Sequence, residues 1–321
     1  MASALELDER AQAGEFETEP VEGRPVAVDY RIFINGFPKA GTHLAEQYIK
    51  PICPPMRAEK PWAGSFVGNS WTETWIEDYS LFRTIGWLGD GSYAKGHMGY
   101  RRDIELFLWG IGATVLFVFR DPRDVAVSQT NHILRGGFHP EPEPFQKIVE
   151  EQGFKAGLRM CIEGWQGEKH FYSGVIARWR HYAPWLWVPW VLSMKFERLT
   201  GDREKMAELI CRACVGRAAL HRGYLAKIPT EALEESVGRM VEFTYKTDKS
   251  PTFFKGTSRQ WEEHFDDDIK ALWKEHDPVA KMPPLFDGVA AAEKWKDYQR
   301  ARDAEPQSWL VRLGYEEHES W

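Results

Sequence analysis

Two short stretches of the sequence carry side chains suited to binding an anion. The first, INGFPKAGTH at residues 34–43, places Lys39, Gly41 and Thr42 between an apolar run and a segment with helical character. The N-terminus of a helix presents unpaired backbone N–H groups and a partial positive charge. A lysine and glycines that allow close approach therefore favour phosphate binding here, and an ordinary strand-to-helix turn is the alternative.

The second stretch, FRDPRDVAVSQ at residues 119–129, places Arg120 at the end of another apolar run. Asp121 is a suitable N-cap, and Pro122 a suitable first residue, for the helix expected to follow. Ser128 then comes two turns along that helix. An arginine at a strand end commonly pairs with a carboxylate. The sharper hypothesis is that Arg120 and Ser128 converge on a phosphate.

The segments around these stretches alternate between strand-like and helix-like patterns. Residues 26–36, 112–120 and 190–199 are rich in β-branched, aromatic and other apolar side chains, and each run precedes a helical pattern. A further helix is indicated by apolar residues at helical spacing before the second run (Ile104, Phe107, Leu108 and Ile111). The alternation predicts one α/β domain over residues 26–321, with a central parallel sheet flanked by helices. Its ligand is expected at the carboxyl ends of the strands.

Composition and charge exclude several classes of protein. The net charge of −7 is concentrated in residues 1–25, where seven acidic side chains outnumber two basic ones, which predicts an acidic flexible tail. The remainder has no block of Lys and Arg, which argues against a nucleic-acid partner. With no signal-peptide pattern or membrane span, a cytoplasmic location is expected. Cys211 and Cys214 are expected to be reduced structural thiols, and no metal site is predicted.

Four motifs together resemble those of a known enzyme family. GFPKAGTH and FVFRDPRDVAVS are similar to the PKSGTTW and RxPxDxxxS signatures of sulfotransferases that use 3′-phosphoadenosine 5′-phosphosulfate (PAPS). YAKGHMGY at residues 93–100 resembles the K-[ST]-H-L segment of this family. FKGTSRQWEEHF at residues 254–265 resembles its RKGxxGxWKNHF loop, and MKFERL at residues 194–199 more weakly resembles its YED element. The resemblance implies the P-loop-like sulfotransferase fold.

The resemblance also implies roles for individual residues. Lys39 would stabilise the phosphate that leaves when the sulfuryl group is transferred, and the product would be 3′-phosphoadenosine 5′-phosphate (PAP). His97 would remove the proton from the acceptor, as a neutral imidazole can near neutral pH. Lys95 would add charge near the transferring group. The donor would be bound by Pro38, Lys39, Ala40, Gly41, Thr42, His43, Arg120, Ser128, Phe196, Lys255 and Gly256.

Several positions depart from the family pattern. In the first loop, Ala40 stands at a serine position, His43 at a threonine position and Leu44 at a tryptophan position. In the late loop, Phe254 replaces arginine and Arg259 replaces glycine, so positive charge has moved within the loop. Phe196 replaces the tyrosine of the YED element, which keeps a ring for adenine but removes the hydroxyl.

The acceptor is expected to be a small molecule with a hydroxyl or amine. Aromatic residues gather in residues 62–93, and those not used in the core would line an apolar or aromatic acceptor pocket. Residues 138–172 are expected to form a long excursion that covers the site. Two other functions are the alternatives: a P-loop-like kinase or nucleotide hydrolase, which the missing G-K-[ST] order disfavours, and a non-catalytic nucleotide-binding module.

Overall fold

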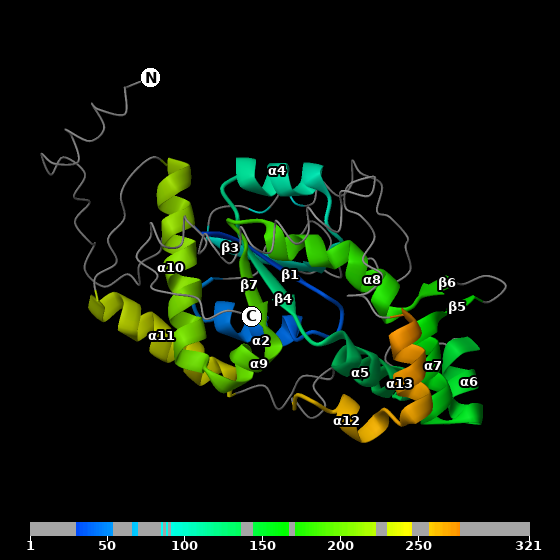
Figure 1. Ribbon diagram of the computed structural model, residues 1–321. Helices are drawn as coiled ribbons and strands as arrows, with labels where there is room; N and C mark the ends of the chain where they lie inside the picture. Colours follow the sequence, from blue (N-terminus) through cyan, green and yellow to red (C-terminus); the bar gives the residue numbers. More distant parts are fainter. Residues whose placement is uncertain are drawn as a thin grey trace, which may run out of the picture.

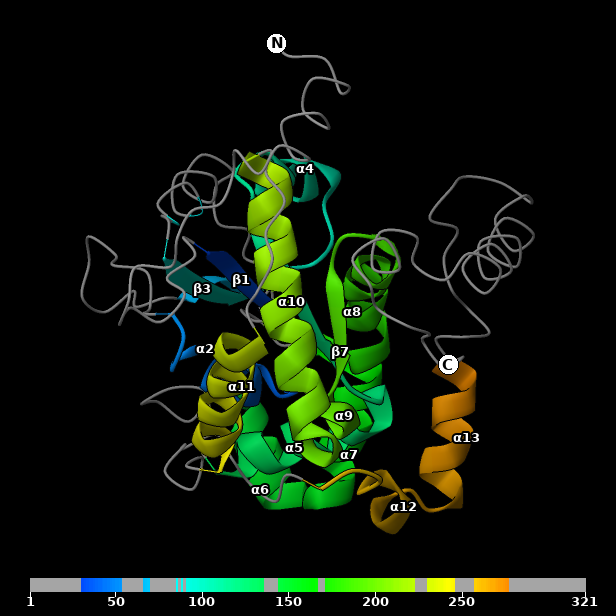
Figure 2. The ribbon, with the colours of Figure 1, turned by 90° about the vertical axis from the view of Figure 1, so that its left-hand side faces the viewer.

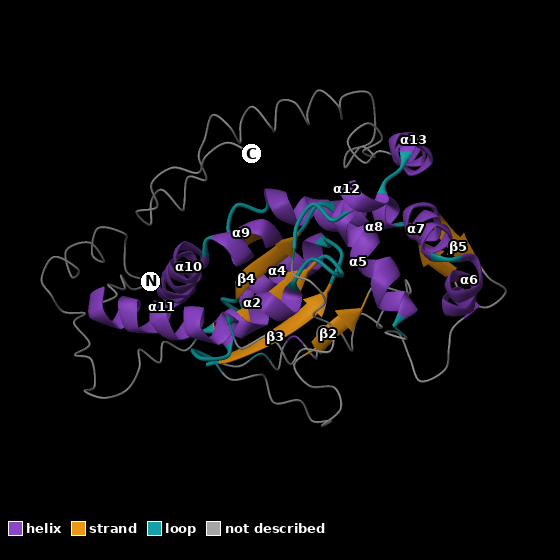
Figure 3. Cartoon of the chain, turned by 90° about the horizontal axis from the view of Figure 1, so that it is seen from below, coloured by secondary structure: helices purple, strands orange, loops and turns teal. Residues whose placement is uncertain are grey.

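A computed structural model describes residues 30–53, 66–69, 85, 88, 91–135, 144–166, 171–222, 230–245 and 257–276. Its centre is a five-stranded sheet whose paired strands all run parallel, in the order β2-β3-β1-β4-β7. The strands are β1 (Arg31–Gly36), β2 (Phe66–Asn69), β3 (Ser92–His97), β4 (Thr114–Phe119) and β7 (Leu192–Lys195). Figure 1 shows the sheet surrounded by helices, and Figure 3 shows the arrows of β2 and β3 running in the same direction. The predicted α/β class and parallel sheet are confirmed.

The central strands are apolar on both faces because helices cover both sides of the sheet. In β1, Ile32, Phe33 and Ile34 are fully buried, and in β4 the run from Val115 to Val118 is fully buried as well. The register pairs Asn35 of β1 with Gly96 of β3 on one side and with Phe117 of β4 on the other. The three strands therefore end at nearly the same level.

Helices connect and cover these strands in the expected order. They are α2 (Thr42–Ile49), α4 (Arg102–Gly110), α5 (Pro122–Leu134), α8 (Val175–Tyr182), α9 (Phe196–Gly201), α10 (Arg203–Arg222) and α11 (Thr230–Thr244). Asp121 caps α5 by accepting a hydrogen bond from the backbone N–H of Arg123, as predicted. The long helix α10 contacts β4 and β1, and α11 packs on α2, as Figure 2 shows from the side.

A second group of elements packs beside α5. It comprises α6 (Pro144–Gln152), α7 (Phe154–Glu163), the antiparallel pair β5 (Gly164–Gln166) and β6 (Phe171–Ser173), α12 (Trp261–His264) and α13 (Asp267–His276). The predicted excursion therefore contains a helical pair and a short hairpin. His264 ends α12, and its ring lies 4.6 Å from that of Phe154.

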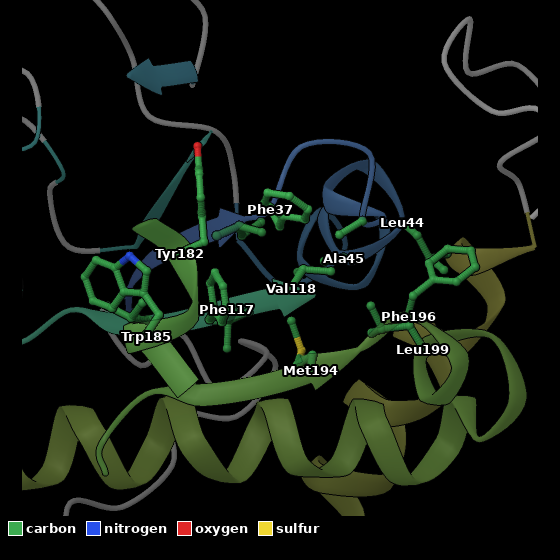
Figure 4. Close-up of a cluster of buried hydrophobic side chains, with 14 of the residues drawn as sticks. Phe37, Leu44, Ala45, Phe117, Val118, Tyr182, Trp185, Met194, Phe196 and Leu199 are labelled. Atoms are coloured by element: carbon green, nitrogen blue, oxygen red, sulfur yellow. The ribbon is translucent and has the colours of Figure 1, made fainter. Parts of the chain in front are cut away.

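The apolar side chains between the sheet and its helices form one core. Figure 4 shows part of it, with Phe37, Phe117 and Met194 projecting from consecutive strands or their ends. The 3₁₀ helix η1 (Ala183–Trp187) contributes the fully buried Trp185. All four cysteines are buried and free, which confirms the expectation of unpaired thiols.

Some expectations concern residues outside the described ranges. These are the acidic tail at residues 1–25 and most of the aromatic segment at residues 62–93. Among the described residues, no helix is long and apolar enough to cross a membrane.

Candidate active site

The predicted site residues lie at one edge of the sheet. His97 ends β3, the loop at residues 37–41 follows β1, Arg120 follows β4 and Phe196 follows β7. These four strands are neighbours in the sheet and run parallel, so their carboxyl ends meet at the same edge. Open α/β sheets bind their ligands at this edge, at the point where the order of the strands along the chain reverses.

The loop between β1 and α2 is tightly folded around Gly41. Its backbone turns through left-handed conformations at Lys39 (φ 65°) and Gly41 (φ 104°). A Cβ atom on Gly41 would lie 2.6 Å from Cδ2 of Phe196, so no side chain fits there. The start of the loop is fixed by a 2.9 Å hydrogen bond from the N–H of Phe37 to the carbonyl of Val118. The glycine therefore allows the loop and Phe196, the first residue of α9, to approach closely.

Two of the predicted site residues have a buried hydrogen-bond donor with no partner among the described residues. These donors are Oγ1 of Thr42, at the first position of α2, and Nε of Arg120. Thr42 is only 5% exposed and Arg120 only 4% exposed. Buried polar groups are nearly always hydrogen-bonded in proteins, so an unsatisfied pair beside a helix N-terminus indicates a site for a ligand with acceptor atoms. A phosphate oxygen meets this requirement.

Lys39 lies in an environment that disfavours its positive charge. Burial, together with the charges of Arg120 and Arg135, lowers the pKa of Lys39 from 10.5 to about 8. An anion placed among these three cations would raise that pKa again and relieve their mutual repulsion. The charges around Lys39 therefore favour an anion at this position.

Arg120 is held by contacts on three sides. Its Nη2 donates a 2.6 Å hydrogen bond to the carbonyl of Thr257 and lies 3.5 Å from Oδ2 of Asp124. Its guanidinium carbon lies 4.4 Å from the centre of the Phe196 ring. Burial lowers the pKa of Arg120, while the neighbouring carboxylates oppose that change. The carboxylate contact that was the alternative interpretation of Arg120 is thus present, and it leaves Nε unsatisfied.

His97 is fixed by the backbone of β1. Its Nδ1 lies 2.7 Å from the carbonyl oxygen of Gly36. A carbonyl can only accept a hydrogen bond, so Nδ1 carries the proton and Nε2 carries the lone pair of the neutral ring. The side chain of Asn35 holds the next residue, since it donates to the carbonyl of Met98 and accepts from its N–H, both at 2.9 Å.

The environment of His97 also changes its titration. Burial lowers the pKa of His97 from 6.5 to about 4, the hydrogen bond to Gly36 opposes this, and the charges of His43, Lys39 and Lys95 add to it. The sequence-based expectation of an ordinary imidazole titrating near neutrality is therefore corrected. His97 is neutral throughout the physiological range, which is the protonation state that a general base needs.

Lys95 is engaged by a carboxylate that the motifs did not indicate. Its Nζ lies 2.6 Å from Oε2 of Glu46, whose Oε1 accepts a 2.8 Å hydrogen bond from the hydroxyl of Tyr93. Nδ1 of His43 lies 3.6 Å from the same carboxylate. Burial opposes the ionisation of Glu46, but hydrogen bonds from His43, Lys95 and Tyr93 dominate and lower its pKa to about 2. Lys95 is thus part of an ion pair between β3 and α2.

The other residues that were predicted to bind the sulfuryl donor are distributed around these side chains. Pro38 and Ala40 are buried in the loop, His43 is exposed on α2, and Ser128 is half-buried on α5. The ring of Phe196 is 5% exposed because it packs under Gly41 and Arg120, and Figure 4 shows Leu44 pointing toward it. Lys255 and Gly256 lie outside the described residues. Among the described residues, no group of three or more His, Cys, Asp or Glu side chains is placed to hold a metal ion.

No role was predicted from the sequence for three supporting residues of the site: Asn35, Glu46 and Asp124, the last of which occupies the D position of the RxPxDxxxS signature. Each is a buried polar residue. Burial of such side chains requires partners, so their positions beside the motifs were the available signal. Their partners are distant in sequence, which is why the pattern alone did not identify them.

Comparisons with known proteins bear on the fold of the chain. No protein-family model and no curated protein matches the sequence. Among solved structures, the chain is similar to mouse sulfotransferase SULT7A1 complexed with PAP, with 16% identity, coverage of 84% of this chain and 89% of that chain, and a TM-score of 0.50. It is also similar to a retinol dehydratase in complex with androsterone and the inactive cofactor PAP, with 14% identity, 83% coverage of each chain and a TM-score of 0.47. The first likeness shows that the chain has the sulfotransferase fold.

Proposed function

We propose that this protein is a PAPS-dependent sulfotransferase that acts on a hydroxyl or amine of a small-molecule acceptor. The observation that carries the proposal is the meeting of Lys39, Thr42, Arg120 and His97 at one edge of a parallel sheet. Two of these side chains have buried polar atoms that lack partners among the described residues. The fold is that of a sulfotransferase solved with PAP, which supports the same nucleotide here.

The residues divide the chemistry between donor and acceptor. Lys39 and the N-terminus of α2, with the hydroxyl of Thr42, are suited to the 5′ side of the donor, where negative charge builds on the leaving phosphate oxygen. Arg120 and Ser128 are suited to the 3′-phosphate. Nε2 of His97 would take the acceptor proton as the acceptor oxygen or nitrogen bonds to sulfur and the bond from sulfur to the leaving oxygen breaks. The products are PAP and the sulfated acceptor.

The ion pair of Lys95 with Glu46 refines this assignment. Because the ammonium group is already neutralised by a carboxylate at 2.6 Å, Lys95 contributes less charge to the transferring group than Lys39 does. Its role in the proposal is to fix β3 against α2, and so to place His97. The proposal further includes an apolar or aromatic acceptor, a cytoplasmic location and no requirement for a metal ion.

Nucleotide-dependent stabilisation tests the proposed function. PAP at about 100 times its Kd should raise the free energy of unfolding by roughly 2.7 kcal/mol, whereas AMP at the same concentration should give much less. ATP with Mg²⁺ is the comparison for the kinase alternative, and a larger effect of ATP than of PAP would refute the proposal. Transfer of labelled sulfate from PAPS to a panel of alcohols, phenols and amines then separates an enzyme from a non-catalytic binding module.

A further inference from the structure

The carboxylate of Asp124 connects helix α5 to a segment far along the chain. Asp124 lies in the first turn of α5 and is 1% exposed. Its Oδ2 accepts a 2.8 Å hydrogen bond from the backbone N–H of Arg259, and its Oδ1 accepts one of 3.1 Å from the N–H of Trp261. One buried carboxylate thus fixes two backbone groups at the start of α12.

The backbone of this segment is shaped to receive an anion. Arg259 has a left-handed conformation (φ 62°), and Gln260 follows it in a right-handed one (φ −61°, ψ −27°). In a turn of this kind, nearby N–H groups face the same side and form a concavity that binds an anion, which here is the carboxylate of Asp124. The left-handed conformation costs a residue with a side chain roughly 1–2 kcal/mol. The two hydrogen bonds to Asp124 offset this cost.

The same carboxylate is adjacent to the arginine of the candidate active site. Oδ2 of Asp124 lies 3.5 Å from Nη2 of Arg120, and that nitrogen donates a 2.6 Å hydrogen bond to the carbonyl of Thr257. A second contact clamps the segment, since the guanidinium carbon of Arg123 lies 3.7 Å from the centre of the Trp261 ring. Arg120 and residues 257–261 are therefore held together through α5.

We propose that Asp124 is the positioning residue for recognition of the 3′-phosphate of the donor. This inference rests on the proposed function. Asp124 holds Nη2 of Arg120 toward Thr257 and leaves Nε, which is buried and has no partner among the described residues, for a phosphate oxygen. It also keeps residues 257–261 beside Arg120. Its charge acts in the opposite direction, because a carboxylate near Arg120 repels a phosphate.

This opposition makes the effect of Asp124→Asn diagnostic. If charge were its main contribution, the neutral amide would strengthen binding of PAP. The amide has only one oxygen, so it can replace only one of the two carboxylate oxygens that accept from the backbone N–H groups. If positioning dominates, PAP binding therefore weakens. We expect affinity for PAP, measured by calorimetric titration, to fall at least about tenfold, the scale of one lost hydrogen bond to a charged group. Affinity for AMP, which lacks the 3′-phosphate and has no group at this position, should change by less than about twofold.

Two further measurements separate this role from general loss of structure. In Asp124→Asn, hydrogen exchange at the amides of Arg259 and Trp261 should accelerate. Arg259→Gly is the matched control, because glycine keeps the N–H, favours a positive φ and removes a guanidinium that pairs with Glu262 at 2.6 Å. This control should keep its preference for PAP over AMP.

Several results would overturn the inference. Unchanged or tighter binding of PAP in Asp124→Asn would do so, as would equal losses for PAP and AMP. Loss of PAP binding in Arg259→Gly would show that the side chain of Arg259, and not Asp124, is responsible for recognition of the 3′-phosphate. If Asp124→Asn does not fold, Asp124→Glu keeps the charge but displaces the carboxylate, and the same loss of preference is expected. A wild-type protein without preference for PAP refutes the proposed function itself, before any variant is compared.

Discussion

The low pKa of His97 makes a prediction about stability that does not require the substrate. The pKa of this imidazole falls from 6.5 to about 4 because the ring is buried beside three basic side chains (Lys39, His43 and Lys95). The stability that the neutral ring contributes is complete above pH 6.5 and is lost as the pH falls toward 4, because the unfolded state then binds the proton first. Over the whole interval this loss is about 3 kcal/mol.

The variant His97→Asn isolates this contribution. Its amide can still donate to the carbonyl of Gly36, which accepts from Nδ1 of His97 at 2.7 Å, but it does not titrate. Urea unfolding of both proteins between about pH 7.5 and pH 5 should therefore diverge. The wild-type protein is expected to lose about 2 kcal/mol more than the variant over this interval. The contributions of the other histidines cancel in the comparison.

The same residue sets the pH dependence of turnover. The acidic limb of the pH profile of kcat/KM reports the pKa of His97 in the free enzyme and should lie near pH 4. The bound donor is an anion, so it should raise the pKa of His97 that the profile of kcat reports. Turnover of His97→Asn with an alcohol acceptor should fall by at least about 10²-fold, with PAP affinity nearly unchanged. The burial argument would be refuted if the unfolding free energies of the two proteins changed equally with pH, or if the acidic limb of kcat/KM lay near 6.5. High activity of the variant on an alcohol would refute the role as base.

Three other predictions test individual contacts. Lys39 has a pKa of about 8, so binding of PAP near that pH should be coupled to uptake of part of a proton. Calorimetry in buffers of different ionisation enthalpy measures this uptake, and Lys39→Met should abolish it. Thr42→Val replaces the hydroxyl of Thr42, which lacks a hydrogen-bond partner among the described residues, by a methyl group of similar size. This variant should have almost unchanged thermal stability but bind PAP about tenfold more weakly than the wild-type protein. An unchanged affinity for PAP would count against a contact between Thr42 and the nucleotide. Glu46→Gln should lower the unfolding free energy at neutral pH by roughly 3 kcal/mol, because Lys95 is left half-buried without its carboxylate. As the pKa of Glu46 is lowered from 4.5 to about 2, this difference should shrink as the pH falls from 4.5 toward 2, and a difference that persists at the acid end would contradict the assignment.

The sequence by itself determined the fold class and the order of the site. Continuous apolar runs before helical patterns require a sheet buried on both faces, and β1, β4 and β7 occur where those runs predicted them. Capping chemistry is local, so Asp121 and the start of α5 were predictable as well. Because parallel strands share a carboxyl edge, motifs that follow each strand had to meet there.

Only the tertiary structure decided the electrostatics and the supporting contacts. The pKa of His97 depends on burial and on charges from three other positions, which no local pattern encodes. The partners of Lys95 and Arg120 are Glu46 and Thr257, which are 49 and 137 residues away in the chain. Such contacts form because buried charges must find partners wherever packing brings them. The sequence therefore specified which groups reach the site, and the packing set their charge states and orientation.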